Sequence, residues 1–329
     1  MKRAFVMGIL LAIVWLLSGC NLITVKESFS KDIALGSIKS LVVQTKNGAI
    51  EFLGTEGSSI SVRGEKRVQG LGNLDEEIKK IIISYDLQGD RLIIKSESPS
   101  DGNFFTKASY GTKFVVYLPP NALASITGRT SNGAVKAQNL ETSIQLTTTN
   151  GGVDLRNTRG RIQADTTNGG IDLYRVELPG GNNVFSTSNG TIQGDLAFAG
   201  NGDCKISTSN GRISLRVPSR SAFDFRASTS NGSIDFFGLS VLLTQSEKNL
   251  KSGRVNTGGF RLDLATSNGT IRDDNDRMAP SRLAAVPGHP GRACSRHTHP
   301  LAPCPCKRQP GSPCRPICRP SRRSRRCQG

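Results

Sequence analysis

The sequence predicts an all-β protein built as a single-stranded β-solenoid, a stack of short strands joined by Asn-Gly turns. The motif Thr, any residue, Asn, Gly, any residue, Val or Ile occurs eight times. From Asn132 to Asn231 the motif Asn residues are spaced by 18, 18, 21, 21 and 21 residues, and Asn268 follows after 37. A repeat period of about 20 residues is typical of stacked supersecondary units. Aromatic residues make up only 5% of the chain, which suits a thin core of small aliphatic side chains.

The Asn-Gly pairs are the expected turn sites of the repeat. Because Gly adopts positive φ freely and Asn tolerates it better than most residues, we expect this conformation at the turns. The eight pairs are Asn47 and Gly48, Asn132 and Gly133, Asn150 and Gly151, Asn168 and Gly169, Asn189 and Gly190, Asn210 and Gly211, Asn231 and Gly232, and Asn268 and Gly269.

Two structures satisfy this pattern. A meander of two-residue hairpins would pair Thr208 with Ile213 across the Asn-Gly turn between them. In a solenoid, each Asn-Gly is instead a corner, and equivalent residues stack from coil to coil. The Thr that begins every copy favours the solenoid, because only an in-register stack rewards identical Thr and Asn columns with hydrogen bonds between neighbours.

The first element is a signal peptide over residues 1–19. Lys2 and Arg3 precede an apolar run from Ala4 to Leu17, which is the arrangement of a secretory signal. The run is too short to cross a bilayer comfortably. Its end, Leu17-Ser18-Gly19-Cys20, resembles the bacterial lipobox.

The lipobox resemblance implies that Cys20 becomes the acylated first residue of the mature protein. It would carry diacylglycerol on its thiol and, in many bacteria, a third fatty-acyl chain on its amine, with palmitate a typical acyl group. Two or more chains suffice for stable anchoring in a membrane. The expected location is the cell envelope: the outer membrane in a diderm, as Asn21 permits by the same resemblance, or the outer face of the plasma membrane in a monoderm.

The body is expected in three parts: residues 20–37 form a lipidated N-terminus and tether, 38–127 an N-terminal β-rich part of the solenoid, and 128–273 the repeats. A first strand is predicted at Ser40–Gln44. Residues Leu87 to Asp90 indicate a hairpin between two Ile-rich runs, and residues 76–80 suggest one helical turn. Pro119 and Pro120 should close the preceding strand, because proline cannot donate to a ladder.

Residues 274–329 differ sharply in composition from the body. Residues 280–329 hold eleven Lys or Arg and no acid, together with ten of the fifteen prolines and six of the eight cysteines. We favour an out-of-frame or otherwise non-native end, and the alternatives are a disordered basic tail and a metal site. The metal reading would use Cys304, Cys306, Cys314 and Cys318 with His297 and His299, but their spacing is irregular for structural zinc.

The repeats resemble the bacterial putative-adhesin family, whose members carry repeated Thr-Ser-Asn-Gly-x-Ile turns. The likeness is close at residues 130–136, 228–236 and 266–271, and it spans roughly residues 38–273. The resemblance implies an envelope-associated toastrack-like β-solenoid without established catalytic residues. The last repeat runs directly into the acidic stretch Asp273 to Asp276, so the final coil is expected to lack a proper cap.

Charge and residue types exclude several classes of function. The net charge of +17 is concentrated in the tail, and residues 20–279 carry 30 basic against 26 acidic residues. The body therefore shows no clustered basic footprint for nucleic acid. Histidine is absent from residues 1–288, which removes Ser/His and Cys/His nucleophile pairs. Cys204 is expected to be a buried apolar residue rather than a reactive thiol.

Asp154 and Asp172 are the best candidates for chemistry. With Asp235 they occupy the same position, four residues after the turn Asn, and four further copies hold Lys136, Gln193, Ser214 and Arg272 there. If the coils stack, Asp154 and Asp172 lie about 4.8 Å apart on adjacent strands. Such a pair raises a pKa or recruits a cation, so weak calcium binding and catalysis stand as alternatives to solvated surface carboxylates.

A column of hydroxyl side chains forms a second candidate site. A flat, hydroxyl-rich ladder could bind glycans or another sheet edge, although a solenoid that binds nothing presents the same surface. Its members occupy the position between Thr and Asn in seven copies: Ser131, Thr149, Thr167, Ser188, Ser209, Ser230 and Ser267.

The sequence therefore predicts a non-catalytic envelope lipoprotein that acts in adhesion, surface binding or scaffolding. Its expected partners are the membrane, through Cys20, and a glycan or another envelope protein; no cofactor is expected. The alternative is an extracytoplasmic sensor module of an envelope-stress system, and the third hypothesis is a polysaccharide-active enzyme on a β-helix.

Overall fold

The computed structural model describes residues 23–99, 108–236, 239 and 241–273. The chain divides into two units, Met1–Ala279 and Pro280–Gly329, and all described residues belong to the first. The predicted signal peptide, Cys20, and the tail with its Cys and His candidates lie outside the described residues.

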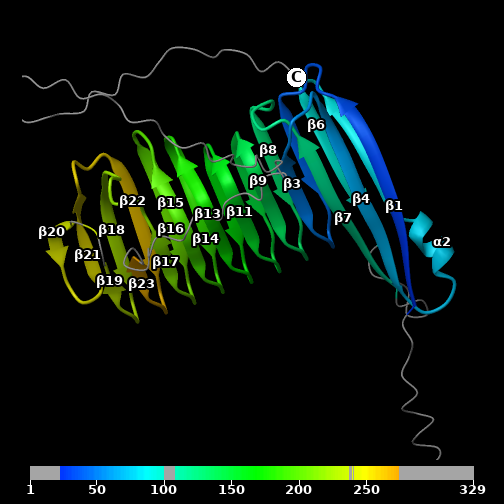
Figure 1. Cartoon of the computed structure of the whole chain (residues 1–329). Helices are drawn as coiled ribbons and strands as arrows, with labels where there is room; N and C mark the ends of the chain where they lie inside the picture. The colour runs from blue at the N-terminus through cyan, green and yellow to red at the C-terminus, as the bar shows by residue number, and fades with distance from the viewer. Residues whose placement is uncertain (1–22, 100–107, 237–238, 240, 274–329) are drawn as a thin grey trace, which may run out of the picture. The chain divides into compact units, whose positions relative to one another are not determined.

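Within these ranges the fold is all-β, as predicted, and consists of two large sheets with one short helix, α2 (Leu74–Lys79) (Figure 1). The first sheet has eleven strands in the order β1 (Ile23–Ala34), β4 (Ser59–Gly70), β7 (Ser109–Leu118), β3 (Ile50–Gly54), β9 (Val135–Glu141), β11 (Val153–Arg159), β13 (Ile171–Leu178), β15 (Ile192–Phe198), β17 (Ile213–Arg216), β23 (Ile271–Asp273) and β19 (Ile234–Asp235).

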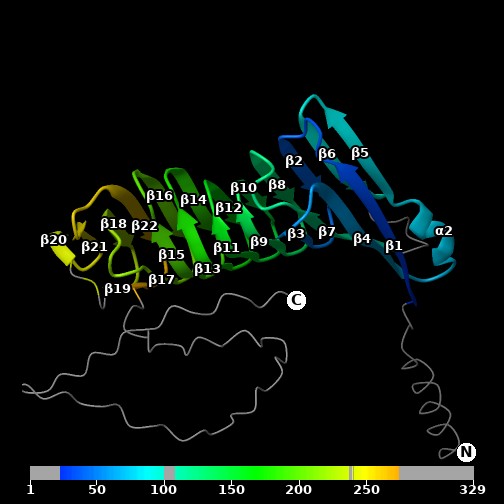
Figure 2. The same ribbon diagram turned by 45° about the horizontal axis from the view of Figure 1, so that its top comes forward.

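The second sheet has twelve strands and runs beside the first (Figure 2). Its order is β20 (Val241–Ser246), β21 (Leu250–Val255), β18 (Phe223–Thr229), β22 (Phe260–Thr266), β16 (Gly202–Thr208), β14 (Gly181–Thr187), β12 (Ile162–Thr166), β10 (Ser143–Thr147), β8 (Ser125–Arg129), β2 (Ser40–Gln44), β6 (Arg91–Glu97) and β5 (Ile82–Gln88).

Each repeat forms one coil of a solenoid: a strand of the twelve-stranded sheet, an Asn-Gly corner, and a strand of the eleven-stranded sheet. Neighbouring coils pair in parallel and in register, with Ile144 opposite Ile162 and Val153 opposite Ile171. Thr208 pairs with Thr187 of the next coil and not with Ile213. The prediction of a solenoid rather than a meander of hairpins is confirmed.

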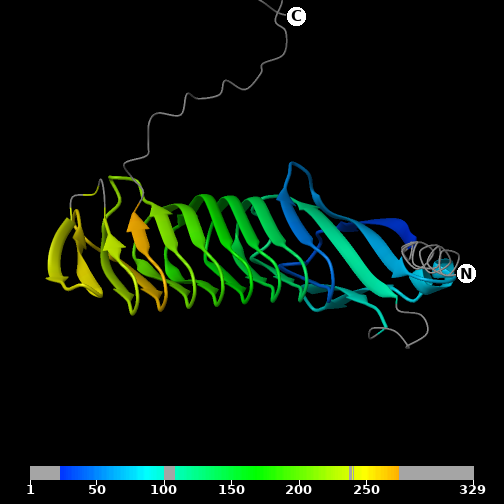
Figure 3. The same cartoon turned by 90° about the horizontal axis from the view of Figure 1, so that it is seen from below.

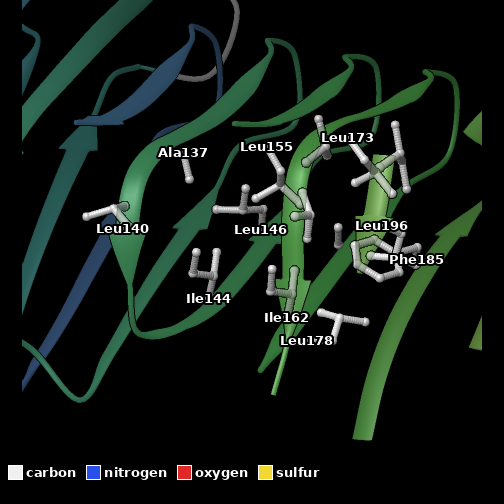
Figure 4. Packing of buried hydrophobic residues seen from close by; sticks show 14 of the residues in the cluster. Ala137, Leu140, Ile144, Leu146, Leu155, Ile162, Leu173, Leu178, Phe185 and Leu196 are labelled. Atoms are coloured by element: carbon white, nitrogen blue, oxygen red, sulfur yellow. The ribbon is translucent and has the colours of Figure 1, made fainter. Parts of the chain in front are cut away.

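The core lies between the two sheets and is filled by side chains from alternate strand positions. Figure 4 shows Leu155 and Leu173 of the first sheet facing the same interior as Leu146 and Phe185 of the second. All four are at most 3% exposed. The interior is aliphatic because each inward position of a coil stacks on its equivalent in the next, which fills a narrow space with few aromatic rings.

The predicted tether differs from the structure. Residues 23–34 form strand β1, which pairs antiparallel with β4 over twelve residues. Phe29 and Ile33 of β1 pack against the core, and the ring of Phe29 meets Phe114 edge-on at 5.6 Å between centroids. Polar residues surround these two side chains, and for this reason the segment does not resemble a strand in the sequence.

The order of coils at the C-terminal end also differs from expectation. The last repeat, β22 and β23, lies between the coil of β16 and β17 and the coil of β18 and β19. Figure 3 shows this orange segment between earlier, greener coils. The final coil therefore does not lack a cap: β18 and β19 lie outside it, and the hairpin of β20 and β21 pairs antiparallel onto β18.

The N-terminal part contains the predicted hairpin, since β5 and β6 pair antiparallel around Gly89. The predicted helical turn is α2, which begins after the cap residue Asn73 and buries Leu74 and Ile78. Strand β7 ends at Leu118, immediately before Pro119. In the described part of the chain, no helix has the length and apolar character that crossing a membrane requires.

Candidate functional site

The Asn side chains of the eight turns form one hydrogen-bonded ladder along the stack. In each bond the Nδ2 of one Asn donates to the Oδ1 of the Asn in the neighbouring coil. The seven bonds run from Asn132 to Asn47 (2.6 Å), Asn150 to Asn132 (2.7 Å), Asn168 to Asn150 (2.8 Å), Asn189 to Asn168 (2.9 Å), Asn210 to Asn189 (2.9 Å), Asn268 to Asn210 (2.8 Å) and Asn231 to Asn268 (2.8 Å).

The Thr hydroxyls form a second column beneath the Asn ladder. Seven of the eight donate to the carbonyl oxygen of the turn glycine in the neighbouring coil, as Thr166 does to Gly151 at 2.7 Å. The other donors, at 2.8–3.1 Å, are Thr130, Thr148, Thr187, Thr208, Thr229 and Thr266. These Thr residues are buried, so the bonds satisfy hydroxyls and carbonyls that would otherwise lack partners.

The turn glycines are required for a different reason from the one expected. Only Gly48, with φ of +135°, has positive φ among the eight. At the other seven, a Cβ would lie 1.8–2.2 Å from the carbonyl oxygen of the turn glycine or its equivalent in the adjacent coil. The expectation of positive φ is wrong for these seven, and close approach between coils excludes a side chain instead.

The predicted hydroxyl column lies on the surface beside this ladder. Six of its members are exposed and Ser131 is half-buried. Backbone bonds hold the column in place, because the amide N–H of six of the eight turn Asn residues donates to the carbonyl of the hydroxyl residue in the next coil, as Asn168 does to Thr149 at 2.8 Å. The result is an even polar strip of hydroxyls and amides with a fixed spacing.

The predicted acidic pair lies in a shallow groove on the outer face of the eleven-stranded sheet. Asp154 of β11 and Asp172 of β13 are opposite each other in register, as expected. The groove has a volume of about 270 Å³. Its lining residues are Asp154, Arg156, Asp172, Leu173, Tyr174, Gln193, Gly194, Ser214 and Arg216.

Neighbouring donors occupy both carboxylates of the groove. Arg156 donates from Nε to Oδ1 of Asp154 at 2.9 Å and from Nη2 to Oδ2 at 3.0 Å. Gln193 donates its Nε2 to Asp172 at 2.9 Å. The two bonds from the guanidinium of Arg156 to Asp154 form a strong, directional pairing. The positive charge of Arg156 therefore offsets the repulsion between the two Asp residues of the groove.

No metal cluster is found at the acidic pair. Within residues 23–99, 108–236, 239 and 241–273, no three His, Cys, Asp or Glu side chains are grouped so that they could hold a metal ion. Asp235 lies two coils away from the groove residue Ser214, opposite Arg272, and its carboxylate accepts a hydrogen bond from Ser233 at 3.0 Å.

A column of left-handed residues shapes the strands beside the groove. Asn139, Asn157 and Arg175 have φ of 55°, 48° and 53°, and Gly194 has φ of 133°. Each forms a bulge that interrupts the in-and-out alternation of side chains along its strand. At Arg175, for example, Tyr174 and Arg175 both face outward, whereas Leu173 and Val176 on either side face the core. The Asn pair spaced by 18 residues was a signal for this bulge, since Asn adopts positive φ more readily than most residues.

Three polar or aromatic groove residues were not predicted from the sequence: Arg156, Tyr174 and Arg216. The guanidinium of Arg175 lies 5.1 Å from the ring centroid of Tyr174, which is 41% exposed. Arg216 pairs with Asp195 of the neighbouring strand. No motif marks these residues, because they share one repeat position, six residues after the turn Asn, at which the residue type varies from coil to coil.

Cys204 is buried, as predicted. Its side chain is 1% exposed and belongs to the core. Burial, with a smaller contribution from Asp263, raises the pKa of its thiol far above the ordinary value, so the reactive thiolate is strongly disfavoured.

Comparisons with known proteins place this fold in a family. A comparison with curated proteins found no match. Among solved structures, the chain is similar to a putative cell adhesion protein from Clostridium sporogenes ATCC 15579 (12% identity, 76% of this chain and 99% of that chain, TM-score 0.35). It is also similar to a putative adhesin from Bacteroides fragilis NCTC 9343 (13% identity, 75% and 97%, TM-score 0.37).

A further similar structure is a putative lipid binding protein from Parabacteroides distasonis ATCC 8503, with 12% identity over 75% of this chain and 96% of that chain and a TM-score of 0.32. The family model described as Toastrack DUF4097 matches residues 38–272, which covers every coil of the solenoid. The chain belongs to the Toastrack DUF4097 family.

Proposed function

We propose that this protein is a non-catalytic, lipid-anchored module of a bacterial envelope that binds a saccharide at the groove beside its amide ladder. The lipobox-like motif that ends at Cys20 supports lipid anchoring. Residues 1–288 contain no histidine, which supports ligand binding rather than catalysis. Envelope polysaccharide is the ligand class that the polar, flat surface fits best.

The observation that carries this proposal is the uninterrupted ladder of seven Asn–Asn hydrogen bonds. Backbone registration and side-chain bonds fix the exposed hydroxyl and amide groups before any ligand arrives. A preorganised surface binds with a smaller loss of conformational entropy than a flexible one. The even spacing of about 4.8 Å between coils presents the same polar groups repeatedly, which suits a polymer.

The groove supplies the contacts that a pyranose ring requires. The exposed ring of Tyr174 offers an apolar face and a polar tip, so a sugar can lay its C–H face against it. Asp154, Asp172 and Arg156 then lie where sugar hydroxyls can donate to carboxylates or accept from the guanidinium.

The same contacts support a binding role over a catalytic one. Both oxygens of Asp154 already accept from Arg156, and Asp172 accepts from Gln193. A general acid must instead hold a proton at the scissile oxygen. We infer that the two carboxylates orient a ligand without transferring protons.

A glycan array probed with the full-length protein tests the saccharide proposal. We expect Asp154→Ala/Asp172→Ala and Tyr174→Ala to lower binding at least tenfold. Asp90→Ala, which removes an exposed carboxylate from a turn remote in sequence, should leave binding unchanged. If every variant binds like the wild type, the groove is not the site. Release of reducing ends from cell-wall polysaccharide by the protein would contradict the non-catalytic role.

Anchoring is tested separately with Cys20→Ala in cells. We expect the wild type to partition into the detergent phase on phase separation and to incorporate labelled palmitate. The variant should do neither. Cys204→Ala is the matched control, because that thiol is buried in the core and its loss should leave labelling unchanged. Labelling that persists in Cys20→Ala would contradict lipidation at this residue.

A further inference from the structure

A basic pocket lies on the outer face of the twelve-stranded sheet, outside the groove described above. Its volume is about 380 Å³. Lys95 of β6 and Arg129 of β8 both pair in register with Gln44 of β2, one on each side. The three side chains therefore stand in a row across adjacent strands, with Lys95 and Arg129 about 10 Å apart at their Cα atoms, which is two strand spacings.

Alternation along the strands fixes these side chains on the outside. Val43 and Ile94 beside them are buried in the core, so Gln44 and Lys95 point away from it. Lys95 and Arg129 are exposed, and neither forms an ion pair within the part of the chain that the structure describes. Lys46 adds a third cation to the lining, and Glu97 is the acid among the lining residues.

From this juxtaposition we infer that the pocket binds a phosphate ester group. Arg129 offers a planar fork of donors and Lys95 a compact ammonium, which are the two side chains that most often hold phosphate. Gln44 and Ser131 add neutral donors between and beside them. The two cations stand on opposite sides of Gln44. A tetrahedral phosphate can direct oxygens toward both cations at once, whereas a planar carboxylate has only two oxygens on one side of its carbon.

Charge distinguishes this pocket from the groove. The groove balances Asp154 and Asp172 against Arg156 and Arg216, whereas Lys46, Lys95 and Arg129 outnumber Glu97 here. A saccharide bound at the groove does not require this pocket, so the inference is independent of the proposed function. The phosphate could be carried by an envelope polymer or by a phospholipid headgroup.

Titration calorimetry of the full-length protein with inorganic phosphate, glycerol 3-phosphate and acetate tests the inference. We expect both phosphates to bind, acetate to bind at least tenfold more weakly, and Lys95→Gln/Arg129→Gln to lower phosphate affinity at least tenfold. Because the contacts are exposed, affinity should fall as salt rises. All variants contain the basic tail, so a difference between them isolates the pocket.

The matched control is Lys205→Gln. Lys205 is an exposed cation of strand β16 in the same sheet, opposite Val184 and Asp263 in register. An equal loss of affinity in this control would reduce the effect to net charge and overturn the inference. Unchanged affinity in the double variant, or acetate binding as tight as phosphate, would overturn it as well. Circular dichroism melting checks that each variant is folded.

A second arm identifies the source of the phosphate once the first arm shows loss of affinity. The probe is a vesicle of phosphatidylglycerol in phosphatidylcholine, compared with phosphatidylcholine alone, in a flotation assay with Cys20→Ala protein. Weaker flotation of the double variant would support the headgroup as the ligand. Equal flotation of both proteins would support a soluble or polymer-borne phosphate ester.

Discussion

At the residue scale, neighbouring coils approach each other closely at the glycine of each turn. The backbone carbonyl of one turn fills the place that a Cβ of the next would take, at 2.0 Å for Gly169 against Gly151. The Thr hydroxyl bonds to this same carbonyl. Glycine and threonine thus recur together, because one permits the contact between coils and the other satisfies the oxygen at the contact.

Gly169→Ala should therefore destabilise the solenoid. The added methyl meets backbone atoms that cannot rotate away, so we expect a loss of about 3 kcal/mol in the free energy of unfolding. Gly152→Ala is the control, since its Cβ would lie 3.3 Å from the carbonyl oxygen of Gly170 and Ala134 occupies the equivalent position. Urea denaturation measures both, and similar midpoints for the two variants would refute the packing argument.

A second residue-scale feature joins α2 to β7. The hydroxyl of Tyr110 donates to Glu77, and Lys80 donates to the other oxygen of Glu77 at 2.7 Å. These bonds, that of Lys80 first, lower the pKa of Glu77 below its ordinary value. Burial, followed by the bond to Glu77, raises the pKa of Tyr110 to about 12.

The two shifts predict opposite limbs of a pH profile. A lowered folded-state pKa of Glu77 gives stability that is complete above pH 4.5, its ordinary value, and is lost as the pH falls further. A raised pKa of Tyr110 gives stability that is lost as the pH rises from 10 to about 12. Glu77→Gln should weaken the acid limb and let Tyr110 ionise at lower pH, as followed by tyrosinate absorbance. Glu76→Gln, which removes only the partner of Lys79 and leaves the Tyr110–Glu77 bond in place, should not change the pH at which Tyr110 ionises.

At the element scale, the last repeat closes the stack from within. Strand β22 bonds to β16 on one side and to β18 on the other, and β18 in turn carries the hairpin of β20 and β21. In the sequence, the outer coil and its cap therefore precede residues 260–273. In the structure, residues 260–273 lie between that coil and the coil of β16 and β17. Stacks need capped ends for solubility, and here the cap depends on an element that follows it in the chain.

Truncation distinguishes this arrangement from a simple consecutive stack. A chain that ends after Gly259 lacks β22 and β23, so β16 and β18 lose their common partner and the cap loses its support. We expect this protein to melt at a clearly lower temperature and to aggregate. A chain that ends after Asp273 keeps every described strand and should melt like the full-length protein. Equal melting temperatures for the two truncations would disprove the inserted order.

At the scale of the whole molecule, the repeated motif predicts the stack of coils but not the strands that are added to it outside the repeat order. The Thr and Asn columns predict the coils, because each position repeats the same local chemistry at the same period. Strand β1 and the inserted final coil are not predictable, since they depend on pairing between distant segments with no repeated motif. The groove follows the same rule: the register of Asp154 and Asp172 is predictable, whereas Tyr174 and Arg216 are not.

The basic pocket shows the reason most clearly. Gln44, Lys95 and Arg129 become neighbours because β2 lies between β6 and β8. All three strands are parallel, but their order in the sheet differs from their order in the sequence, and no residue pattern in the three segments predicts it. Sites made by stacking of different coils therefore require the structure, whereas the turns, the core face and the buried Cys204 can be predicted from residue type and spacing.

The ladder makes a prediction that spans the stack. Asn168 both donates and accepts, whereas Asn231 only donates to Asn268. At about 1 kcal/mol for each hydrogen bond, Asn168→Ala should cost about twice as much free energy of unfolding as Asn231→Ala. Chemical denaturation of the two variants measures this ratio. Equal costs would show that backbone registration alone holds the coils.

All seven Asn–Asn bonds point the same way. Every Nδ2 donates toward the coil of Asn47, and every Oδ1 accepts from the side of Asn231. The amide dipoles therefore add along the stack as peptide dipoles add along a helix, with the positive end at Asn47. Asn47 directly follows Lys46, which lines the basic pocket. The ladder is thus electrically polar, and its electropositive end adjoins the pocket assigned to phosphate, so its two ends are not equivalent to an approaching anion.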